Sequence, residues 1–417
     1  MPLLTPSSRM KLAVFSIVLN HHQAPVADEL WELTGHDFAF VELAPAVEMK
    51  GGTEYFRERP YLLQAWESTE AYGKAMQIAC SAECCIFSGT DSLPFQKKRL
   101  KLGLLSLEMG ERWLKHGWLS LASPRLMKWL WAYSLGGWCD KPLYKLCMGA
   151  FAARDHHRLG TFIGRCYKWG YFVRTEDPLP AATDRKSPKE QCQYIGGGRG
   201  TAPHTAASGC VRIIWCGRFL KLKHPELAVL LARRLKARNL PFRLELYGDG
   251  ALRASMEQAA GKWGLADVVA FHGNVPNAQV REAMRVADIF LFTSDRREGW
   301  GAVAGESLSC GCALVAGGDI GSVPYLVKEG YNGLVFSGPS SRSTLKKPDM
   351  RSLDELERKV CALLAQPDRL ARMQQHAEEE MHRLWSPQRA AANLLQLISD
   401  LECGRETTIS EGPCSKA

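Results

Sequence analysis

Two acids and a pair of glycines stand close together in residues 298–316, EGWGAVAGESLSCGCALVA. The pattern predicts a loop, a short helix that starts near Gly301, and then a buried strand. Gly299 and Gly301 would let the backbone approach a ligand, and the first helical turn would point N–H groups at it. Such a place suits a phosphate. Glu306, one turn into the helix, could reach a sugar diol, with Glu298 at the mouth. Alternatively, Glu306 only caps the helix and the glycines only form turns.

Two basic residues follow the strand that we predict for residues 211–215. Arg218 and Lys223 stand between this strand and a helix expected from about Pro225 to Ala237. Together they could clamp a diphosphate, the guanidinium through paired donors and the ammonium as a point charge. In a sheet built from alternating strands and helices, ligands bind at the carboxyl ends of the strands. Further strands are predicted at residues 244–247, 268–272 and 288–292.

The N-terminal half opens on the same kind of unit. Residues 11–19 and 37–43 are expected to be parallel strands, with a helix over residues 26–33 between them. His21 and His22 end the first strand. One of these imidazoles could face a substrate as a hydrogen-bond donor or base, or both could merely enter the helix. Their spacing does not say which one acts.

A second pair of candidates comes from the same half. Glu108 and Arg112 follow a strand predicted for residues 102–107. Polar residues just past a strand end are site candidates in an open α/β sheet, although most are simply solvated. We therefore keep both as candidates for the acceptor side.

Residues 95–145 are unusually basic and rich in tryptophan, with Trp113, Trp118, Trp129, Trp131 and Trp138 among many lysines and arginines. Such a composition suits an anionic membrane surface or a polyanionic acceptor. It equally suits a packed helical lid with a solvated basic face. Nucleic acid is not expected as a partner, because no recognisable nucleic-acid module accompanies the region.

The chain has 417 residues, more than one core usually holds, which predicts two domains. Composition shifts at the proline- and glycine-rich residues 175–209, which read as a linker between a first domain over 10–174 and a second over 210–402. The polar residues 403–417 are expected to be a disordered tail. The 14 cysteines show no zinc spacing, and reduced thiols in a cytoplasmic protein are the simplest account. Neither a signal peptide nor a membrane span is predicted.

Several landmarks of the second half occur in a characteristic order. They are Gly217-Arg218-Phe219 with Lys223, Tyr247-Gly248-Asp249-Gly250, Phe271-His272-Gly273-Asn274-Val275-Pro276, Glu298 with Glu306, and Gly321-Ser322-Val323-Pro324 with Asn332-Gly333-Leu334. Over about residues 211–400 this set resembles the C-terminal donor domain of glycosyltransferase family 4. The N-terminal half is similar to the acceptor domain of bacterial members that build surface polysaccharides, chiefly through NHHQ and KWGYF. The resemblance implies an α/β GT-B fold, with two Rossmann-like doubly wound parallel-sheet domains facing a cleft.

The resemblance also implies roles for single residues. Glu306 would hold the ribose of a nucleotide sugar, and Glu298 would contact the sugar near its reacting carbon, with His22 close by. The remaining donor contacts implied are Arg218 and Lys223 on the diphosphate, Gly299, Gly301 and Ala302 near the phosphates, and Tyr247, Gly248, Asn274 and Val275 around the base. His21, Glu108 and Arg112 stay candidates for the acceptor side.

The implied reaction is a retaining transfer, hexosyl or related, from a nucleotide-diphosphate sugar to an acceptor hydroxyl. The acceptor would be lipid-linked or a glycan in cell-surface glycan synthesis, handled at the inner face of the membrane. No cofactor and no metal are expected, since no Asp-x-Asp pair is present. Two alternatives stay open, namely an epimerase-like enzyme that modifies the nucleotide sugar and a non-catalytic partner that only binds it.

Overall fold

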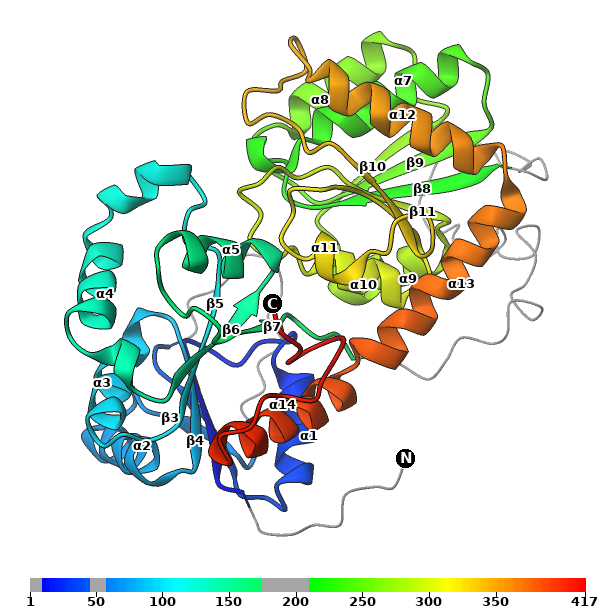
Figure 1. Ribbon diagram of the computed structural model, residues 1–417. Coiled ribbons are helices and arrows are strands. Elements are labelled where there is room, and N and C mark those ends of the chain that lie inside the picture. Colours follow the sequence, from blue (N-terminus) through cyan, green and yellow to red (C-terminus); the bar gives the residue numbers. More distant parts are fainter. Residues whose placement is uncertain (1–9, 46–57, 175–209) are drawn as a thin grey trace. The chain divides into compact units, whose positions relative to one another are not determined.

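The computed structural model describes residues 10–45, 58–174 and 210–417, which form two α/β units (Figure 1). Unit 1 joins Met1–Arg174 to Gly299–Ala302 and Arg383–Ala417, and unit 2 comprises Thr175–Glu298 and Val303–His382. Each unit is built on its own parallel sheet. The linker predicted for residues 175–209 lies outside the described residues.

Unit 1 contains a seven-stranded sheet in the order β3-β2-β1-β4-β5-β6-β7. Its strands are β1 (Leu12–Ser16), β2 (Phe38–Glu42), β3 (Leu62–Gln64), β4 (Cys84–Ser88), β5 (Ser106–Glu111), β6 (Leu143–Met148) and β7 (Cys166–Trp169). Its helices are α1 (Ala24–Leu33), α2 (Thr69–Ser81), α3 (Leu93–Lys101), α4 (Pro124–Ser134), α5 (Ala150–Arg158) and α14 (Pro387–Glu402). All neighbouring strands run parallel.

Unit 2 contains a six-stranded sheet in the order β10-β9-β8-β11-β12-β13, again parallel throughout. Its strands are β8 (Val211–Cys216), β9 (Phe242–Tyr247), β10 (Val269–Gly273), β11 (Ile289–Phe292), β12 (Ala313–Gly317) and β13 (Gly333–Phe336). Its helices are α7 (Pro225–Ala237), α8 (Arg253–Lys262), α9 (Asn277–Val286), α10 (Val303–Ser309), α11 (Val323–Leu326), α12 (Met350–Leu364) and α13 (Pro367–Leu384), which continues into unit 1.

Both sheets are doubly wound, because the chain starts at a central strand, moves to one edge and then returns to the other. The reversal falls between β1 and β4 in unit 1 and between β8 and β11 in unit 2. At each reversal, the loops that follow the two neighbouring strands run in opposite directions and leave a crevice between them. The carboxyl ends of these strands are therefore the usual ligand site in such a sheet. The expected fold class is thus confirmed.

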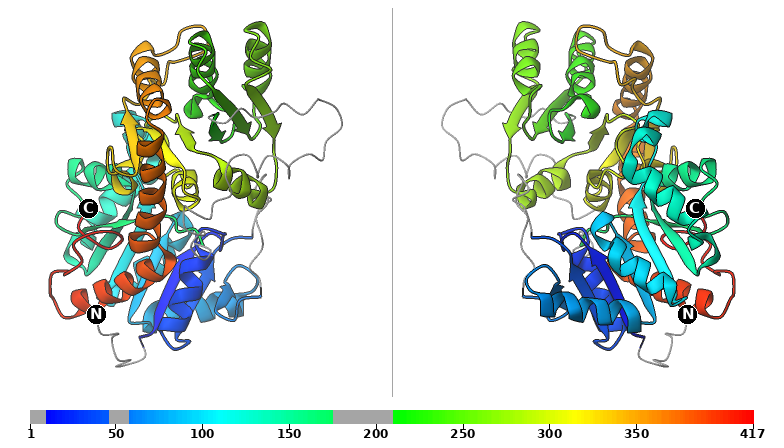
Figure 2. Two further views of the ribbon diagram at one scale, coloured as in Figure 1. Left: turned by 90° about the vertical axis from the view of Figure 1, so that its right-hand side faces the viewer. Right: turned by 90° about the vertical axis from the view of Figure 1, so that its left-hand side faces the viewer.

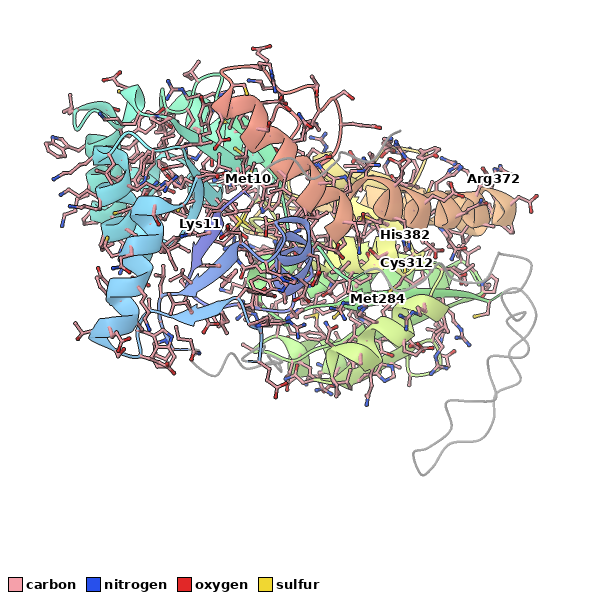
Figure 3. The ribbon with its side chains drawn as sticks, turned by 90° about the horizontal axis from the view of Figure 1, so that it is seen from below. Met10, Lys11, Met284, Cys312, Arg372 and His382 are labelled. Carbon is pink, nitrogen blue, oxygen red and sulfur yellow. The ribbon has the colours of Figure 1, made fainter. Side chains whose placement is uncertain are left out.

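Apolar runs without alternation explain why the sheet of unit 2 is covered on both faces. Every residue of β11 and of β12 is buried, as in parallel strands packed between two layers of helices. Figures 1 and 2 show α7, α8 and α12 together on one side of this sheet and α9 with α10 on the other. On the second side, the Cys312 thiol lies 3.0 Å from the carbonyl oxygen of Met284 at the end of α9 (Figure 3). This contact gives Cys312 a packing role.

The C-terminal residues differ from the disordered tail that we expected. The peptide N–H groups of Cys414 and Ala417 donate to carbonyl oxygens of β7, at 2.8 and 3.1 Å, and the Cys414 side chain is fully buried. Figure 1 places the C-terminus beside β7. This strand is the edge of its sheet and leaves backbone groups unpaired, which the tail covers. The polar composition of the C-terminal residues could not reveal that the edge strand β7 has unpaired backbone groups for them to bind.

The predicted end of the second domain at residue 402 also differs from the observed division. Helix α14 groups with unit 1 and packs against α1, where Gln388 donates a hydrogen bond to Glu29 at 2.6 Å. Its amphipathic pattern predicts a buried face but not the partner of that face. Among the described residues, none of the helices combines the length and apolarity needed to cross a bilayer. Each cysteine in the same residues is a free thiol.

Candidate functional site

The reversal point of unit 2 brings together a predicted cation and a predicted acid. Lys223 lies in a short 3₁₀ turn after β8, and Glu298 lies in the loop after β11. The Lys223 ammonium is 2.5 Å from the Glu298 carboxylate, and the two side chains are only 16% and 14% exposed. The ammonium also lies 5.8 Å from the centre of the Phe292 ring. A largely desolvated ammonium at strand ends can bind an anion that competes with the carboxylate.

Arg218 lies on the same loop as Lys223 but is solvent-exposed. Within the described ranges, no acid is paired with its guanidinium, so its donors can meet a phosphate. The loop itself is firmly placed. Phe219 N–H donates to the Asp249 carbonyl at 2.9 Å and Leu220 N–H to the Arg218 carbonyl at 2.7 Å. The structure therefore confirms that Arg218 and Lys223 follow one strand, while their joint contact with a diphosphate stays a prediction.

Glu306 is buried near the start of α10, with 7% of its surface exposed. Burial raises the pKa of its carboxyl, and a hydrogen bond from Asn277 and the charge of Arg281 lower it by less. The Asn277 amide nitrogen, at the start of α9, lies 3.5 Å from Glu306 Oε1. A buried acceptor of this kind can bind hydroxyl groups, as the ribose role requires. The role itself stays a prediction.

The glycine-rich start of the same stretch agrees with our expectation of a short helix that starts near Gly301. Helix α10 begins at Val303 and is short. Gly301 has φ = 81°, a conformation that disfavours other residues, and ends the loop before the helix. Gly299, Gly301 and Ala302 group with unit 1 by their contacts, whereas Glu298 and Glu306 group with unit 2. A phosphate contact by these three residues stays a prediction.

Close backbone packing explains the one glycine, Gly248, that we expected around the base. A Cβ added to Gly248, where φ is 112°, would lie 2.1 Å from the carbonyl oxygen of Gly217. Gly248 N–H also donates to the Gly273 carbonyl at 2.7 Å. The loops after β8, β9 and β10 thus touch through their glycines, which is a structural reason for glycine at position 248. Its contact with a base is not tested by this geometry.

The other residues expected at the base sit on the same strand ends. Tyr247 is buried, its hydroxyl donates to Glu245 at 3.0 Å, and its ring stacks on His272 with centroids 4.4 Å apart. Burial is the main reason that the pKa of Tyr247 is raised. Asn274 is exposed and Val275 half-buried in the loop after β10. An open backbone loop next to a fixed aromatic pair is compatible with a base site.

The two histidines of unit 1 form the entry to α1. Asn20 Oδ1 accepts hydrogen bonds from the peptide N–H groups of His22 and Gln23, at 3.0 and 3.2 Å, which turns the chain into the helix. The His21 and His22 rings are 3.8 Å apart, and His22 is 5.3 Å from Tyr171. Burial, and then the charge of His21, lower the pKa of His22 to about 3. His22 is therefore a neutral hydrogen-bonding group at neutral pH and a weak base.

Both acceptor-side candidates of β5 are engaged in internal ion pairs. Glu108 lies within β5, not past its end, and binds the fully buried Lys145 at 2.8 Å. The strand begins later than predicted because Leu102 and Gly103 form the turn that ends α3. Arg112 is buried and contacts both carboxylate oxygens of Asp155, at 3.1 and 3.2 Å. Arg112 therefore has a structural role, and its contact with an acceptor stays a prediction.

A cavity of about 1520 Å³ opens above these residues within unit 1. Its wall contains Glu108 and four of the tryptophans, Trp113, Trp129, Trp131 and Trp138. Its lining lysines and arginines are Lys97, Lys101, Arg112, Lys115, Arg125, Lys128, Lys141 and Lys145. The cavity has a mixed lining of aromatic rings and cations, which suits an anionic molecule with apolar parts.

The tryptophans of residues 95–145 divide into two groups. Trp113 and Trp129 pack edge to face with centroids 4.4 Å apart, and Trp129 stacks on Tyr133. Trp118 and Trp131, by contrast, are 62% and 63% exposed. Further exposed apolar side chains of the region are Leu102, Leu119, Met127 and Leu135. The region is thus both a packed helical lid and an apolar surface with basic neighbours, so neither of our two interpretations is excluded.

Sequence reasoning missed a set of buried polar residues next to Lys223. His224 and Asp295 are completely buried and lie 3.1 Å apart, and Glu226 lies on the other side of His224. Their positions at strand ends offered a signal, since Asp295 follows β11 and His224 precedes α7. Nothing in the spacing alone shows that they meet.

Part of the sequence matches a known protein family. Residues 204–379 match the sequence model of the family described as glycosyl transferases group 1. The D-inositol 3-phosphate glycosyltransferase of Thermobispora bispora is 27% identical over 198 residues, 45% of this chain and 42% of that protein. A GDP-mannose-dependent alpha-(1-6)-phosphatidylinositol monomannoside mannosyltransferase of Mycolicibacterium smegmatis is 25% identical over 193 residues, 45% and 47% of the two chains. The matched part spans less than half of these relatives.

Solved structures show the same fold over nearly the whole chain. The Anabaena protein HepE, in complex with UDP, has a TM-score of 0.65 at 13% identity and covers 94% of this chain and 100% of its own. The sucrose-phosphate synthase of Thermosynechococcus elongatus has a TM-score of 0.64 at 16% identity, with 95% and 100% covered. At sequence identities this low, the similarity shows a shared fold and nothing about a shared activity. The chain therefore has the GT-B fold, and its residues 204–379 match the model of the group 1 glycosyl transferases.

Proposed function

We propose that the protein transfers a sugar from a nucleotide-diphosphate sugar to an acceptor hydroxyl, with retention of the anomeric configuration. The observation that carries the proposal is the Lys223–Glu298 pair at the reversal point of the second sheet, with Arg218 on the same loop. Two relatives are named as transferases of glycosyl or mannosyl groups, and HepE was solved with UDP. These likenesses support a nucleotide sugar as the donor of this chain too.

On the donor side, the reaction needs positive charge where the diphosphate leaves. Lys223 and Arg218 supply two cations at the carboxyl end of β8. As the bond from the sugar to the diphosphate breaks, negative charge grows on the bridging oxygen, and a prepositioned ammonium stabilises it more strongly than it stabilises the intact donor. Glu298, released from Lys223 by the diphosphate, can accept hydrogen bonds from sugar hydroxyls. Glu306 is proposed to accept from the ribose.

His22 is proposed to act as a neutral hydrogen-bonding group toward the transferred sugar. Its lowered pKa leaves the imidazole uncharged at neutral pH, so that it can orient a hydroxyl without adding a charge. The proposal assigns charge stabilisation to side chains, and no metal ion or other cofactor is required for it.

On the acceptor side, we propose that the cavity of unit 1 receives a lipid-linked or glycan acceptor. The lining supports this choice, since its rings suit sugar faces or hydrocarbon and its cations suit phosphate. The exposed Trp118, Leu119 and Trp131 near basic residues support attachment to an anionic membrane surface. The protein would then work at the cytoplasmic face of a membrane, in the synthesis of cell-surface glycans.

Transfer can be tested with UDP- and GDP-sugars and a lipid extract as the acceptor source. We expect release of nucleoside diphosphate together with sugar on the lipid or glycan product, and the anomeric proton coupling of the product reports retention. Lys223→Met should lose about 10²–10³ of the rate, whereas Lys221→Met, an exposed lysine of the same turn, should not. A changed nucleotide sugar without transfer would identify an epimerase-like enzyme. Binding without any turnover would identify a non-catalytic partner.

A further inference from the structure

Two loops of unit 2 are tied together beneath the Lys223–Glu298 pair. The Thr293 hydroxyl donates to the carbonyl oxygen of Lys223 at 2.7 Å and accepts from the Trp215 indole N–H at 2.9 Å. Next to it, the peptide N–H of Asp295 donates to the Leu222 carbonyl at 2.9 Å. The main chain on both sides of the Lys223 Cα is thus attached to the loop that carries Glu298. Movement of one loop requires movement of the other.

His224 occupies an unusual place between these loops. Its φ of 47° is left-handed, a conformation in which glycine or asparagine is more common. The ring is completely buried, with Nε2 3.1 Å from Asp295 Oδ2 and Nδ1 2.7 Å from Glu226 Oε1. Both partners are carboxylates that only accept, so each ring nitrogen has to carry a proton. Burial lowers the pKa of His224, but the bonds to Asp295 and Glu226 outweigh it and raise the pKa above its ordinary value.

Asp295 connects this imidazolium to the acid of the pair. Its carboxylate binds His224 and also Arg297, whose guanidinium nitrogens lie 2.5 and 3.0 Å away. Its carbonyl oxygen accepts the peptide N–H of Glu298 at 3.0 Å. Burial raises the pKa of Asp295, while the hydrogen bonds from His224 and Arg297 bring it down to about 2. One residue therefore holds the backbone of Glu298 and, through His224, the chain next to Lys223.

We propose that Asp295 and His224 are positioning residues that hold Lys223 and Glu298 in register for a nucleotide-diphosphate sugar. The proposal rests on the function proposed above. The network carries two positive charges, on the buried His224 and the partly exposed Arg297, and two negative charges, on the buried Asp295 and Glu226. These charges balance to zero, so the support stays in place when the charge of the neighbouring pair changes. When a diphosphate replaces Glu298 as the partner of the Lys223 ammonium, the backbone of Lys223 would then stay in place.

The far end of the network offers a matched control. Glu226 also accepts from the Ser343 hydroxyl at 3.0 Å, and Ser343 Oγ in turn accepts from the peptide N–H of Asp349 at 3.1 Å, in the segment before α12. Ser343→Ala removes a buried hydrogen bond from the same network without touching the loops of Lys223 and Glu298. It should lower stability by an amount similar to other single buried hydrogen bonds, but leave the site in register.

The test uses the full chain with Asp295→Asn, His224→Asn and Ser343→Ala. Asparagine tolerates the left-handed conformation at position 224, which keeps that variant foldable. Limited acetylation followed by mass spectrometry measures the reactivity of Lys223 relative to the exposed Lys221. We expect this ratio to rise at least about threefold in the first two variants and to stay unchanged in the control, because a lysine freed from its carboxylate is a better nucleophile.

Kinetics separate positioning from simple destabilisation. Misplacement of a reacting group by about 1 Å can lower turnover by about 10², and we expect such a loss in Asp295→Asn and His224→Asn. The wild-type rate should also fall at alkaline pH as His224 loses its proton between Asp295 and Glu226, and His224→Asn should lack that limb. If both variants only unfold at lower temperature, with unchanged Lys223 reactivity, turnover and pH profile, the proposal is wrong. If the wild type transfers no sugar, the proposed function fails, while the acetylation ratio still decides the positioning role.

Discussion

Replacing Glu298 by Gln should tighten the binding of a nucleoside diphosphate while it abolishes sugar transfer. In the structure the Glu298 carboxylate holds the Lys223 ammonium at 2.5 Å, and both side chains are mostly buried. A diphosphate therefore has to compete with this carboxylate for the ammonium. The amide of Gln keeps the shape of the side chain and removes the competing charge. The same change removes the acceptor that we assign to the hydroxyls of the donor sugar.

The size of the effect follows from the geometry of the pair. Two unit charges at the observed 2.5 Å attract by about 1.7 kcal/mol in bulk water and about 7 kcal/mol at an effective dielectric constant of 20. Both ions have lost hydration in the protein, which offsets much of this attraction. A net value of about 2 kcal/mol corresponds to a gain of about 30-fold in the affinity for the diphosphate, at 1.4 kcal/mol for each factor of ten.

Isothermal titration calorimetry with UDP and with GDP measures this gain without interference from turnover. Glu282→Gln on α9 is a matched control, because it makes the same charge change in an exposed acid that pairs with Arg285 at 3.0 Å. The control should bind as the wild type does. Unchanged or weaker binding of both nucleotides by Glu298→Gln would refute the view that Glu298 and the diphosphate compete for Lys223.

Three further outcomes are expected. Arg112→Met should lower the free energy of unfolding, measured in urea, by about 3–5 kcal/mol, because it leaves the fully buried Asp155 without its ion-pair partner. A much smaller loss of stability, or a loss of turnover in protein that is still folded, would indicate a role at the acceptor. Gly248→Ala should unfold at a markedly lower temperature, since its Cβ would meet the Gly217 carbonyl; an unchanged melting temperature would contradict this packing. The pKa of His22 is about 3 in the folded chain against 6.5 in the unfolded chain, so stability should fall as pH drops from about 6.5 toward 3, and His22→Phe should reduce that slope.

The fold was largely predictable because parallel sheets leave a strong local signature. Buried runs such as Ile289–Phe292 and Ala313–Gly317 have no polar alternation, and each is followed by polar or glycine-rich residues. The signature weakens where local and tertiary forces disagree. Residues 102–107 are apolar enough for a strand, but the first of them end α3, and the strand that pairs with β4 begins at Ser106.

Single residues of the candidate site were predictable from the sequence, but the contacts between them were not. Lys223 and Glu298 were identified separately, and their contact depends on β8 and β11 being neighbours, which the order of strands along the chain does not state. Arg112 shows the opposite case. Its position after a strand suggested a ligand, whereas the tertiary fold places Asp155 within reach and turns the guanidinium inward. A charged residue at a strand end is informative only once its possible partners are known.

The two reversal points differ in the charge that they carry, and this difference supports our proposal that the diphosphate leaves from the second sheet. After β1, the chain offers His22, an imidazole that burial keeps neutral. After β8 and β11, it offers Lys223 with Glu298, backed by a buried network whose own charges cancel. A leaving diphosphate needs fixed cations more than it needs a base, because its charge grows during bond cleavage. The same doubly wound order therefore places a neutral imidazole near one reversal point and a largely buried pair of opposite charges at the other.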